Sequence, residues 1–187
     1  MNILQVGCHT GNDEHCDLVE KADSAVLIDA NERCITEAKE KYKDFSHVSF
    51  EAIAVVPIDL GDAKIKLFHE EEKETSSWTS VNPDFVAAHC HHNNLKYFES
   101  DTTTLSKLLQ KYPETDTLIL DTEGLDFLNI LSIDGELIDK IDTLIFEFIH
   151  CDGIVTKGPK LQSLLNYLTY VGFSDIKQDC YNLECKK

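Results

Sequence analysis

Short apolar runs alternate along the chain with stretches whose apolar residues recur at helical spacing. Runs that are apolar at nearly every position are typical of buried parallel strands, which are covered on both faces. Such strands are expected at 3–6, 25–29, 117–121 and 142–149. The clearest amphipathic helix is expected at 31–42, where Asn31 is a suitable N-cap.

Weaker patterns complete this alternation. Segments 13–21, 103–111, 125–131 and 161–171 are expected to be helices. Further strands are expected at 48–53, at 64–69 as an edge strand, at 95–99, and as a pair within 173–185. The sum predicts an α/β fold with a doubly wound, mostly parallel, Rossmann-like sheet and an antiparallel C-terminal hairpin.

Residues 1–187 are expected to form a single domain, because this length suffices to bury one core. One polar insertion, at about 70–94, departs from the alternation. Such an insertion beside the active edge of an α/β sheet is either a flap that faces the substrate or a plain surface loop.

Candidate chemistry begins where the first two strands end. The first strand runs into a loop with Gly7 and Gly11, and the second ends on Asp29. In doubly wound folds, this pairing lets backbone approach a nucleotide-type cofactor while the acid takes the ribose hydroxyls. A dinucleotide fingerprint would need glycine at positions 9 and 12, where His9 and Asn12 stand. Gly7-x-x-x-Gly11 instead resembles the looser loop of S-adenosylmethionine (SAM) methyltransferases.

Taken in order, several segments resemble the motifs of the FkbM-type methyltransferases, a branch of the class I SAM-dependent fold. The most specific is Asp121-Thr-Glu123-Gly124, followed by Asp126. Two departures stand out: Gln5 occupies the place of an acid that normally lies near the cofactor's ammonium group, and Leu120 that of a lysine. The matching segments are 5–11, 29–31, 53–54, 76–80, 103–105, 120–126 and 144–147.

This resemblance implies SAM as the cofactor and gives it a set of binding residues. Two of them have alternative interpretations: Asp29 as a helix N-cap and His9 as a solvent-facing loop residue. The implied cofactor-binding residues are Gln5, Gly7, Cys8, His9, Gly11, Asp29, Ala30, Ile53 and Ala54.

Acids gather where two of the central strands end. Asp121, Glu123 and Glu147 follow or close these strands, and His150 comes shortly after. Ligands of open α/β sheets bind beyond the carboxyl ends of strands. These four residues are therefore the candidates to deprotonate an acceptor hydroxyl, and the carboxylates are also suited to a divalent metal ion. Alternatively, Asp121 contacts the cofactor, and Glu123 shapes the following turn.

Charge and cysteine content narrow the possible partners. The chain has 34 acidic and 17 basic residues, a net charge of −17, which disfavours a nucleic-acid substrate. No apolar run reaches the ~18–20 residues of a membrane span. The seven cysteines have irregular spacing, and a strand is expected from residue 3, which leaves no room for a signal peptide. A cytoplasmic protein with reduced thiols is expected, and the sequence leaves its oligomeric state open.

The sequence thus predicts a SAM-dependent methyltransferase that acts on a hydroxyl of a small molecule or glycan. The absence of an Asn-Pro-Pro-Tyr-like element at 121–124 argues against methylation of adenine amino groups. The alternative is a degenerate SAM-fold domain that acts as a non-catalytic binding or regulatory module, which the loss of the acid at Gln5 motivates.

Overall fold

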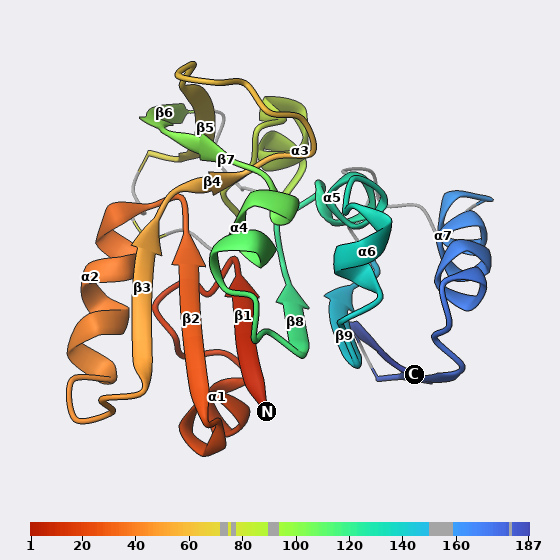
Figure 1. Cartoon of the computed structure of the whole chain (residues 1–187). Coiled ribbons are helices and arrows are strands. Elements are labelled where there is room, and N and C mark those ends of the chain that lie inside the picture. The colour runs from red at the N-terminus through yellow and green to blue at the C-terminus, as the bar shows by residue number, and fades with distance from the viewer. Residues whose placement is uncertain (72–74, 76–77, 90–93, 150–158, 180) are drawn as a thin grey trace.

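The computed structural model of the chain describes residues 1–71, 75, 78–89, 94–149, 159–179 and 181–187. Its main sheet has seven strands (Figure 1). Five of them are parallel, in the spatial order β3 (Val48–Ala52), β2 (Ser24–Asp29), β1 (Asn2–Val6), β8 (Thr117–Leu120) and β9 (Thr143–Glu147). Next to β9, antiparallel, lies β11 (Asn182–Lys186), and β10 (Asp175–Gln178) pairs antiparallel with β11 at the edge. The predicted doubly wound sheet with its antiparallel C-terminal hairpin is confirmed.

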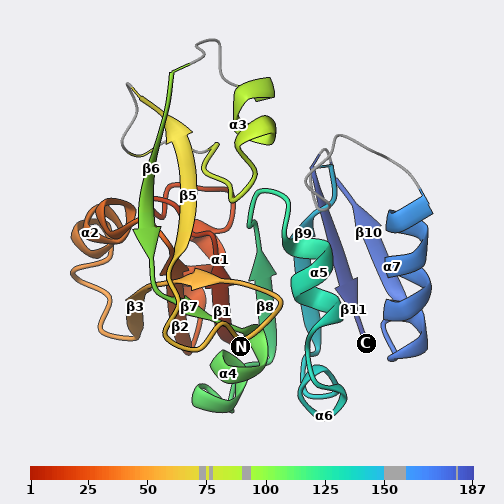
Figure 2. The same ribbon diagram turned by 90° about the horizontal axis from the view of Figure 1, so that it is seen from above.

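Helices cover both faces of this sheet (Figure 2). On one face, Val19 and Ile35 from two helices pack with the strand residues Ile3 and Leu27. On the other face, residues of four helices pack around strand residues such as Phe146. The first pair is α1 (Cys16–Lys21) and α2 (Glu32–Lys41), and the second group is α4 (Leu105–Lys111), α5 (Asp126–Leu131), α6 (Gly135–Ile138) and α7 (Pro159–Tyr170).

The register of the parallel strands brings their carboxyl ends together. Val6 at the end of β1 lies opposite Ile28 on β2 and Leu120 on β8. Leu120 in turn lies opposite Phe146 on β9. The residues that follow these positions therefore meet at one edge of the sheet, where the sequence predicts the site.

Elements of secondary structure lie within or beside the expected polar insertion. Its flanks, β5 (Ile65–Glu70) and β6 (Leu95–Ser100), form an antiparallel pair apart from the main sheet, so the first is not the edge strand of that sheet. The segment also contains a helix that was not predicted, α3 (Pro83–His89). Figure 1 shows these elements above the carboxyl ends of the parallel strands.

Three other details differ from the sequence prediction. The first helix begins at Cys16 instead of residue 13, because the Asp13 carboxylate accepts a hydrogen bond from the backbone N–H of His15 at 2.8 Å and closes a turn there. The short helix α6 was not predicted. Nor was the parallel pairing of β4 (Ala54–Val55) with β7 (Thr102–Thr103), which connects the insertion to the main sheet.

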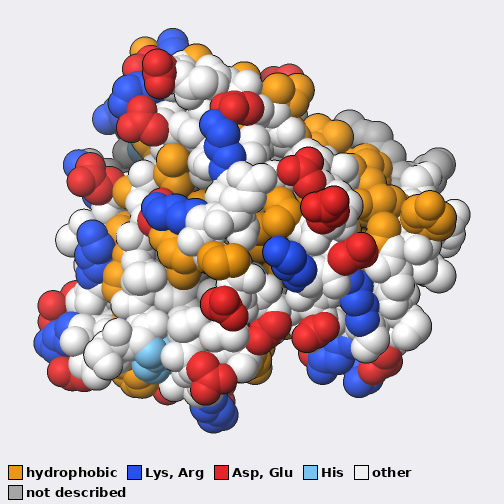
Figure 3. Space-filling model, in the orientation of Figure 1, with side chains coloured by type: hydrophobic (Ala, Val, Ile, Leu, Met, Phe, Trp, Pro, Cys, Tyr) orange, Lys and Arg blue, Asp and Glu red, His pale blue; other side chains and the backbone are white. Residues whose placement is uncertain are grey.

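Charged side chains of both signs are mixed on the face shown in Figure 3. Among the described residues, several lysines are paired with acids. Lys107 lies 2.7 Å from Asp59, and Lys111 lies 2.8 Å from Glu51. None of the helices in the described part of the chain combines the length and apolar character that crossing a membrane requires.

The start of α4 gives a first prediction. The side chain of Thr104, the N-cap, accepts a hydrogen bond from the backbone N–H of Lys107 at 3.3 Å. Thr104→Ala is expected to lower the free energy of unfolding by about 1 kcal/mol, since that N–H loses its acceptor. Thr104→Ser, which also loses the methyl group but keeps the hydroxyl, is the control in urea unfolding. Equal losses in the two variants would contradict a capping role.

Candidate functional site

A cavity of about 280 Å³ opens at the carboxyl edge of the parallel strands. Its walls come from the loops after β1, β2, β3 and β8 and from the insertion. Of the nine predicted cofactor-binding residues, six line it: Gly7, His9, Asp29, Ala30, Ile53 and Ala54.

Gly7 lies where the loop after β1 passes between its neighbouring strands. Its backbone N–H donates to the carbonyl of Ile28 at 2.8 Å, so the loop stays bonded to β2. On the other side, a Cβ at Gly7 would lie 1.7 Å from the backbone oxygen of Asp121. Gly7 also has a φ of +81°, a backbone conformation that residues with a Cβ rarely adopt. Only glycine fits this position without moving one of the two walls.

Asp29 closes β2 and holds the glycine loop through its carboxylate. One oxygen accepts from the backbone N–H of His9 at 2.9 Å, and the other from that of Asn31 at 2.8 Å. Burial raises the pKa of Asp29, while these two hydrogen bonds lower it. The N-cap of α2 is Asn31, whose side chain accepts from the backbone N–H of Arg33, so the interpretation of Asp29 as the N-cap is wrong.

His9 connects the glycine loop to the insertion. Its ring Nε2 lies 2.8 Å from the backbone oxygen of Thr75, and its φ is +48°. A left-handed φ is uncommon for a residue other than glycine and carries some strain. His9 lines the cavity and is only partly exposed, so it is not the solvent-facing residue of the alternative interpretation.

The other three predicted residues lie beside the cavity and do not line it. Gln5 is buried on β1, and its Nε2 donates to the carboxylate of Asp13 at 2.6 Å. Cys8 is fully buried in the core, and burial raises the pKa of its thiol. Gly11 lies under Tyr42, where a Cβ would approach the ring to 2.7 Å, and its carbonyl accepts from the Tyr42 hydroxyl at 3.1 Å. Gly11 thus has a structural reason to be glycine.

Several lining residues were not predicted. Asp13 and Glu14 follow the glycine loop, Thr122 follows Asp121, and Thr79 and Val81 come from the insertion. Asp13 had a recognisable signal, because an aspartate shortly before a helix commonly accepts a backbone hydrogen bond in a turn, and Asp13 lies three residues before Cys16, where α1 begins. For the insertion, the sequence indicated a segment beside the active edge of the sheet, but its local pattern did not indicate which of its residues face the cavity.

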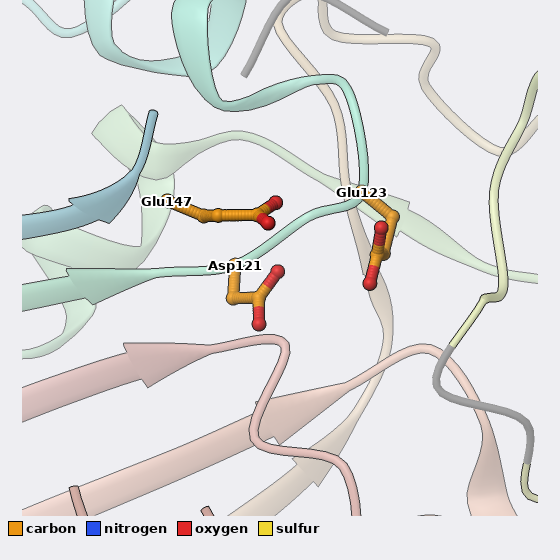
Figure 4. A group of neighbouring side chains, drawn as sticks. All are labelled: Asp121, Glu123 and Glu147. Carbon is orange, nitrogen blue, oxygen red and sulfur yellow. The ribbon is translucent and has the colours of Figure 1, made fainter. Parts of the chain in front are cut away.

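The three predicted acids of the described chain converge (Figure 4). Glu147 comes from the end of β9, Asp121 directly follows β8, and Glu123 lies in the next loop, with carboxylate oxygens within 4.8 Å of one another. Asp121 and Glu123 also line the cavity. The fourth predicted residue, His150, lies outside the described residues.

Burial and crowding favour the protonated forms of this cluster. Burial, followed by the negative charges of Asp121, Glu147 and Asp126, raises the pKa of Glu123 to about 10. Burial and the charges of Asp126 and Glu14 raise the pKa of Glu147 to about 7. The pKa of Asp121 is also raised, by the protein that surrounds its carboxyl group and by the charges of Asp126 and Glu147, although the residue is exposed at the cavity. Such a cluster retains protons at neutral pH and can exchange them with a bound ligand.

The insertion covers the cavity and is tied to the acidic loop. The Ser80 hydroxyl donates to the backbone oxygen of Glu123 at 2.8 Å, and Ser80 also pairs through its backbone with Phe68 on β5. Glu123 itself has a φ of +48°. With Leu67 and Val81 lining the cavity, the insertion forms a roof that contacts both the glycine loop and the acidic loop.

Comparisons with known proteins bear on the fold. No protein-family model matches the chain, and no curated protein does. Among solved structures, a chain of the fibrillarin/Nop5p complex is similar, with a TM-score of 0.50 at 8% identity over 98% of this chain and 70% of that chain. The N-methyltransferase NodS from Bradyrhizobium japonicum WM9 has a TM-score of 0.45 at 13% identity, over 98% of this chain and 83% of that one. A ribosomal protein L11 methylase from Lactobacillus delbrueckii subsp. bulgaricus has a TM-score of 0.42 at 11% identity, over 98% and 67%.

The FkbM branch stays a prediction, since no family model supports it. The fold itself is shown by the order of the main sheet, by the antiparallel strand between β9 and β10, and by the similarity to the fibrillarin/Nop5p complex. The chain has the Rossmann-like fold of the class I SAM-dependent methyltransferases.

Proposed function

We propose that the chain is a SAM-dependent methyltransferase whose acceptor is a hydroxyl group on a small molecule or glycan. One observation carries this proposal: a single cavity is lined by Gly7 and Asp29 on one side and by Asp121 and Glu123 on the other. The first pair is suited to binding a nucleoside cofactor, and the second pair can accept a proton from the acceptor hydroxyl.

The chemistry of the lining residues fits SAM. Each carboxylate oxygen of Asp29 accepts one backbone hydrogen bond and keeps a second lone pair for a ribose hydroxyl. Ile53, Val55 and Leu67 provide apolar surface suited to an adenine ring. When bound, SAM supplies an electrophilic methyl group on a sulfonium.

The contribution of the chain is to position the acceptor and to take its proton. A hydroxyl is a weak nucleophile, so its proton leaves as the new bond forms. Glu147, with a pKa of about 7, is partly ionised near neutral pH and shares the cluster with two acids that line the cavity. We assign the base to this cluster, with His150 as a further candidate. The same three carboxylates also provide the hard oxygen ligands that Mg²⁺ prefers.

Calorimetric titration with SAM tests the cofactor site. The wild-type chain is expected to bind with micromolar affinity, about −8 kcal/mol. Asp29→Ala is expected to weaken binding at least a hundredfold, because it removes both the ribose acceptor and the bond to the His9 N–H. Asp44→Ala, at an exposed position in the loop before β3, is the control and is expected to bind as the wild type does.

Failure of the wild-type chain to bind SAM at millimolar concentration would refute the proposed function. The non-catalytic binding or regulatory module would then be the better description. If SAM binds but no hydroxyl acceptor in a screen is methylated, the cofactor assignment stands and the acceptor class is wrong.

A further inference from the structure

Asp13 is held at the cavity wall by two hydrogen bonds. Its Oδ1 accepts from the backbone N–H of His15 at 2.8 Å, and its Oδ2 accepts from Nε2 of Gln5 at 2.6 Å. Gln5 is 3% exposed and lies on β1, so the position of its side-chain amide is fixed by the sheet. A carboxylate has about four lone-pair positions, and these two bonds leave capacity for another donor.

In the part of the chain that the structure describes, no neighbouring cation neutralises the charge of Asp13. Among the described residues, no ion pair involves Asp13, and the residues that line the cavity include no lysine or arginine. Asp13 lines the cavity together with Asp29 and Asp121. This wall of the cavity is therefore suited to a positively charged group of a ligand.

We infer that Asp13, held in place by Gln5, binds the α-ammonium group of SAM. This inference rests on the proposed function, since it assigns one end of the proposed cofactor. SAM carries its ammonium on the methionine portion, opposite the adenosine that Asp29 is assigned to bind. A charge-assisted hydrogen bond to that ammonium is shorter and stronger than a neutral one.

The other acids at the cavity are less suited to this task. Asp29, at the end of β2, is already assigned to the ribose hydroxyls at the opposite end of the cofactor. Glu14 is exposed, and its carboxylate accepts from Nδ2 of Asn182 at 2.6 Å. Asp121 and Glu123 lie with Glu147 in the carboxylate cluster, with oxygens within 4.8 Å of one another, that is assigned to the proton of the acceptor.

The hydrogen bond to Asp13 explains why an amide suits position 5 better than a carboxylate. A carboxylate there would lie within hydrogen-bond distance of the Asp13 carboxylate, and the two like charges would repel each other. An amide instead donates to Asp13 and orients it. Gln5 is a positioning residue, and the acid that the FkbM resemblance leads one to expect on the strand is supplied from the following loop.

Comparing two ligands distinguishes ammonium binding by Asp13 from a general effect of the substitution on the cavity. S-adenosylhomocysteine has the ammonium group, whereas 5′-methylthioadenosine shares the adenosine and the sulfur but has no amino-acid portion. By calorimetry, Asp13→Asn is expected to weaken S-adenosylhomocysteine binding about tenfold or more and to change 5′-methylthioadenosine binding less than twofold. Gln5→Ala is expected to weaken the first ligand severalfold and to spare the second. Asp17→Asn, the same chemical change at an exposed position of α1 that does not line the cavity, is the matched control and leaves both affinities within twofold.

Three results would overturn the inference while leaving the proposed function intact. These are equal weakening of both ligands in Asp13→Asn, no weakening of either, and a selective loss of S-adenosylhomocysteine in Asp121→Asn instead of Asp13→Asn. If the wild-type chain binds neither ligand, both the inference and the proposed function fail together. Thermal unfolding of Asp13→Asn shows whether equal weakening reflects a lost fold.

Discussion

Gly7→Ala is expected to lower the free energy of unfolding by about 3 kcal/mol and to abolish SAM binding. The new Cβ would lie 1.7 Å from the backbone oxygen of Asp121, and the residue would have to keep a φ of +81°. A left-handed conformation costs about 1–2 kcal/mol for residues other than glycine, and forcing atoms into a packed region adds about 1–3 kcal/mol. Relief of the clash would move the glycine loop or the Asp121 backbone, and both border the cavity.

Gly61→Ala separates backbone strain from the clash. Gly61 has a φ of +60°, but a Cβ there would meet nothing within 4 Å. It is expected to cost about 1 kcal/mol and to leave SAM affinity unchanged. Urea unfolding and calorimetry on both variants provide the comparison. A Gly7→Ala chain that unfolds like Gly61→Ala and still binds SAM would show that the loop position is wrongly assigned.

Glu123→Gln is expected to stabilise the protein at alkaline pH and to leave it unchanged near pH 4. In the folded chain the pKa of Glu123 is raised to about 10, against an ordinary value of 4.5. Between these two values the folded state binds more protons than the unfolded state, so the contribution of this group to stability falls as pH rises. Glutamine, which has a similar shape and no charge, does not have this dependence.

The expected difference between Glu123→Gln and wild type is near zero at pH 4 and on the order of 5 kcal/mol at pH 8, in favour of the variant. One oxygen of Glu123 is buried without a hydrogen-bond partner in the described part of the chain, which agrees with a costly ionisation. Urea unfolding at several pH values with EDTA present measures the difference. Glu136→Gln, an exposed position on α6, is the control for loss of a surface charge. A variant less stable than wild type at pH 8 would mean that the carboxylate is ionised and stabilised in the folded chain.

The sequence predicted the strands, and with them the part of the site that strand ends determine. Continuous apolar runs located β8 and β9, so Asp121 and Glu147 could be expected at one edge of the sheet before their contact was seen. The glycine loop and Asp29 followed from the same logic. In each case the position of the residue depends on where a strand ends, and the apolar pattern predicts that strand end.

Contacts that depend on side-chain packing could not be predicted from the sequence. The hydrogen bond of Gln5 with Asp13 joins a strand residue to a loop residue, and no local pattern encodes it. The helix α3 was missed because it lies in a polar segment whose few apolar residues, such as Phe85 and Val86, are buried within the insertion and not against the main sheet. His9 could be placed in the loop, but its contact with Thr75 required knowledge of where the insertion folds back.

The pairing of β4 with β7 has a consequence for how such a chain can diverge. The segment between β4 and β7 begins and ends at two strands that lie side by side. Ala54 pairs with Thr102 and Val55 with Thr103, in parallel. A segment whose two ends are adjacent can be lengthened, shortened or exchanged without altering the strands that it joins. The roof over the cavity is therefore the part that can change most freely during evolution, while the strand ends that form the floor of the cavity stay as they are.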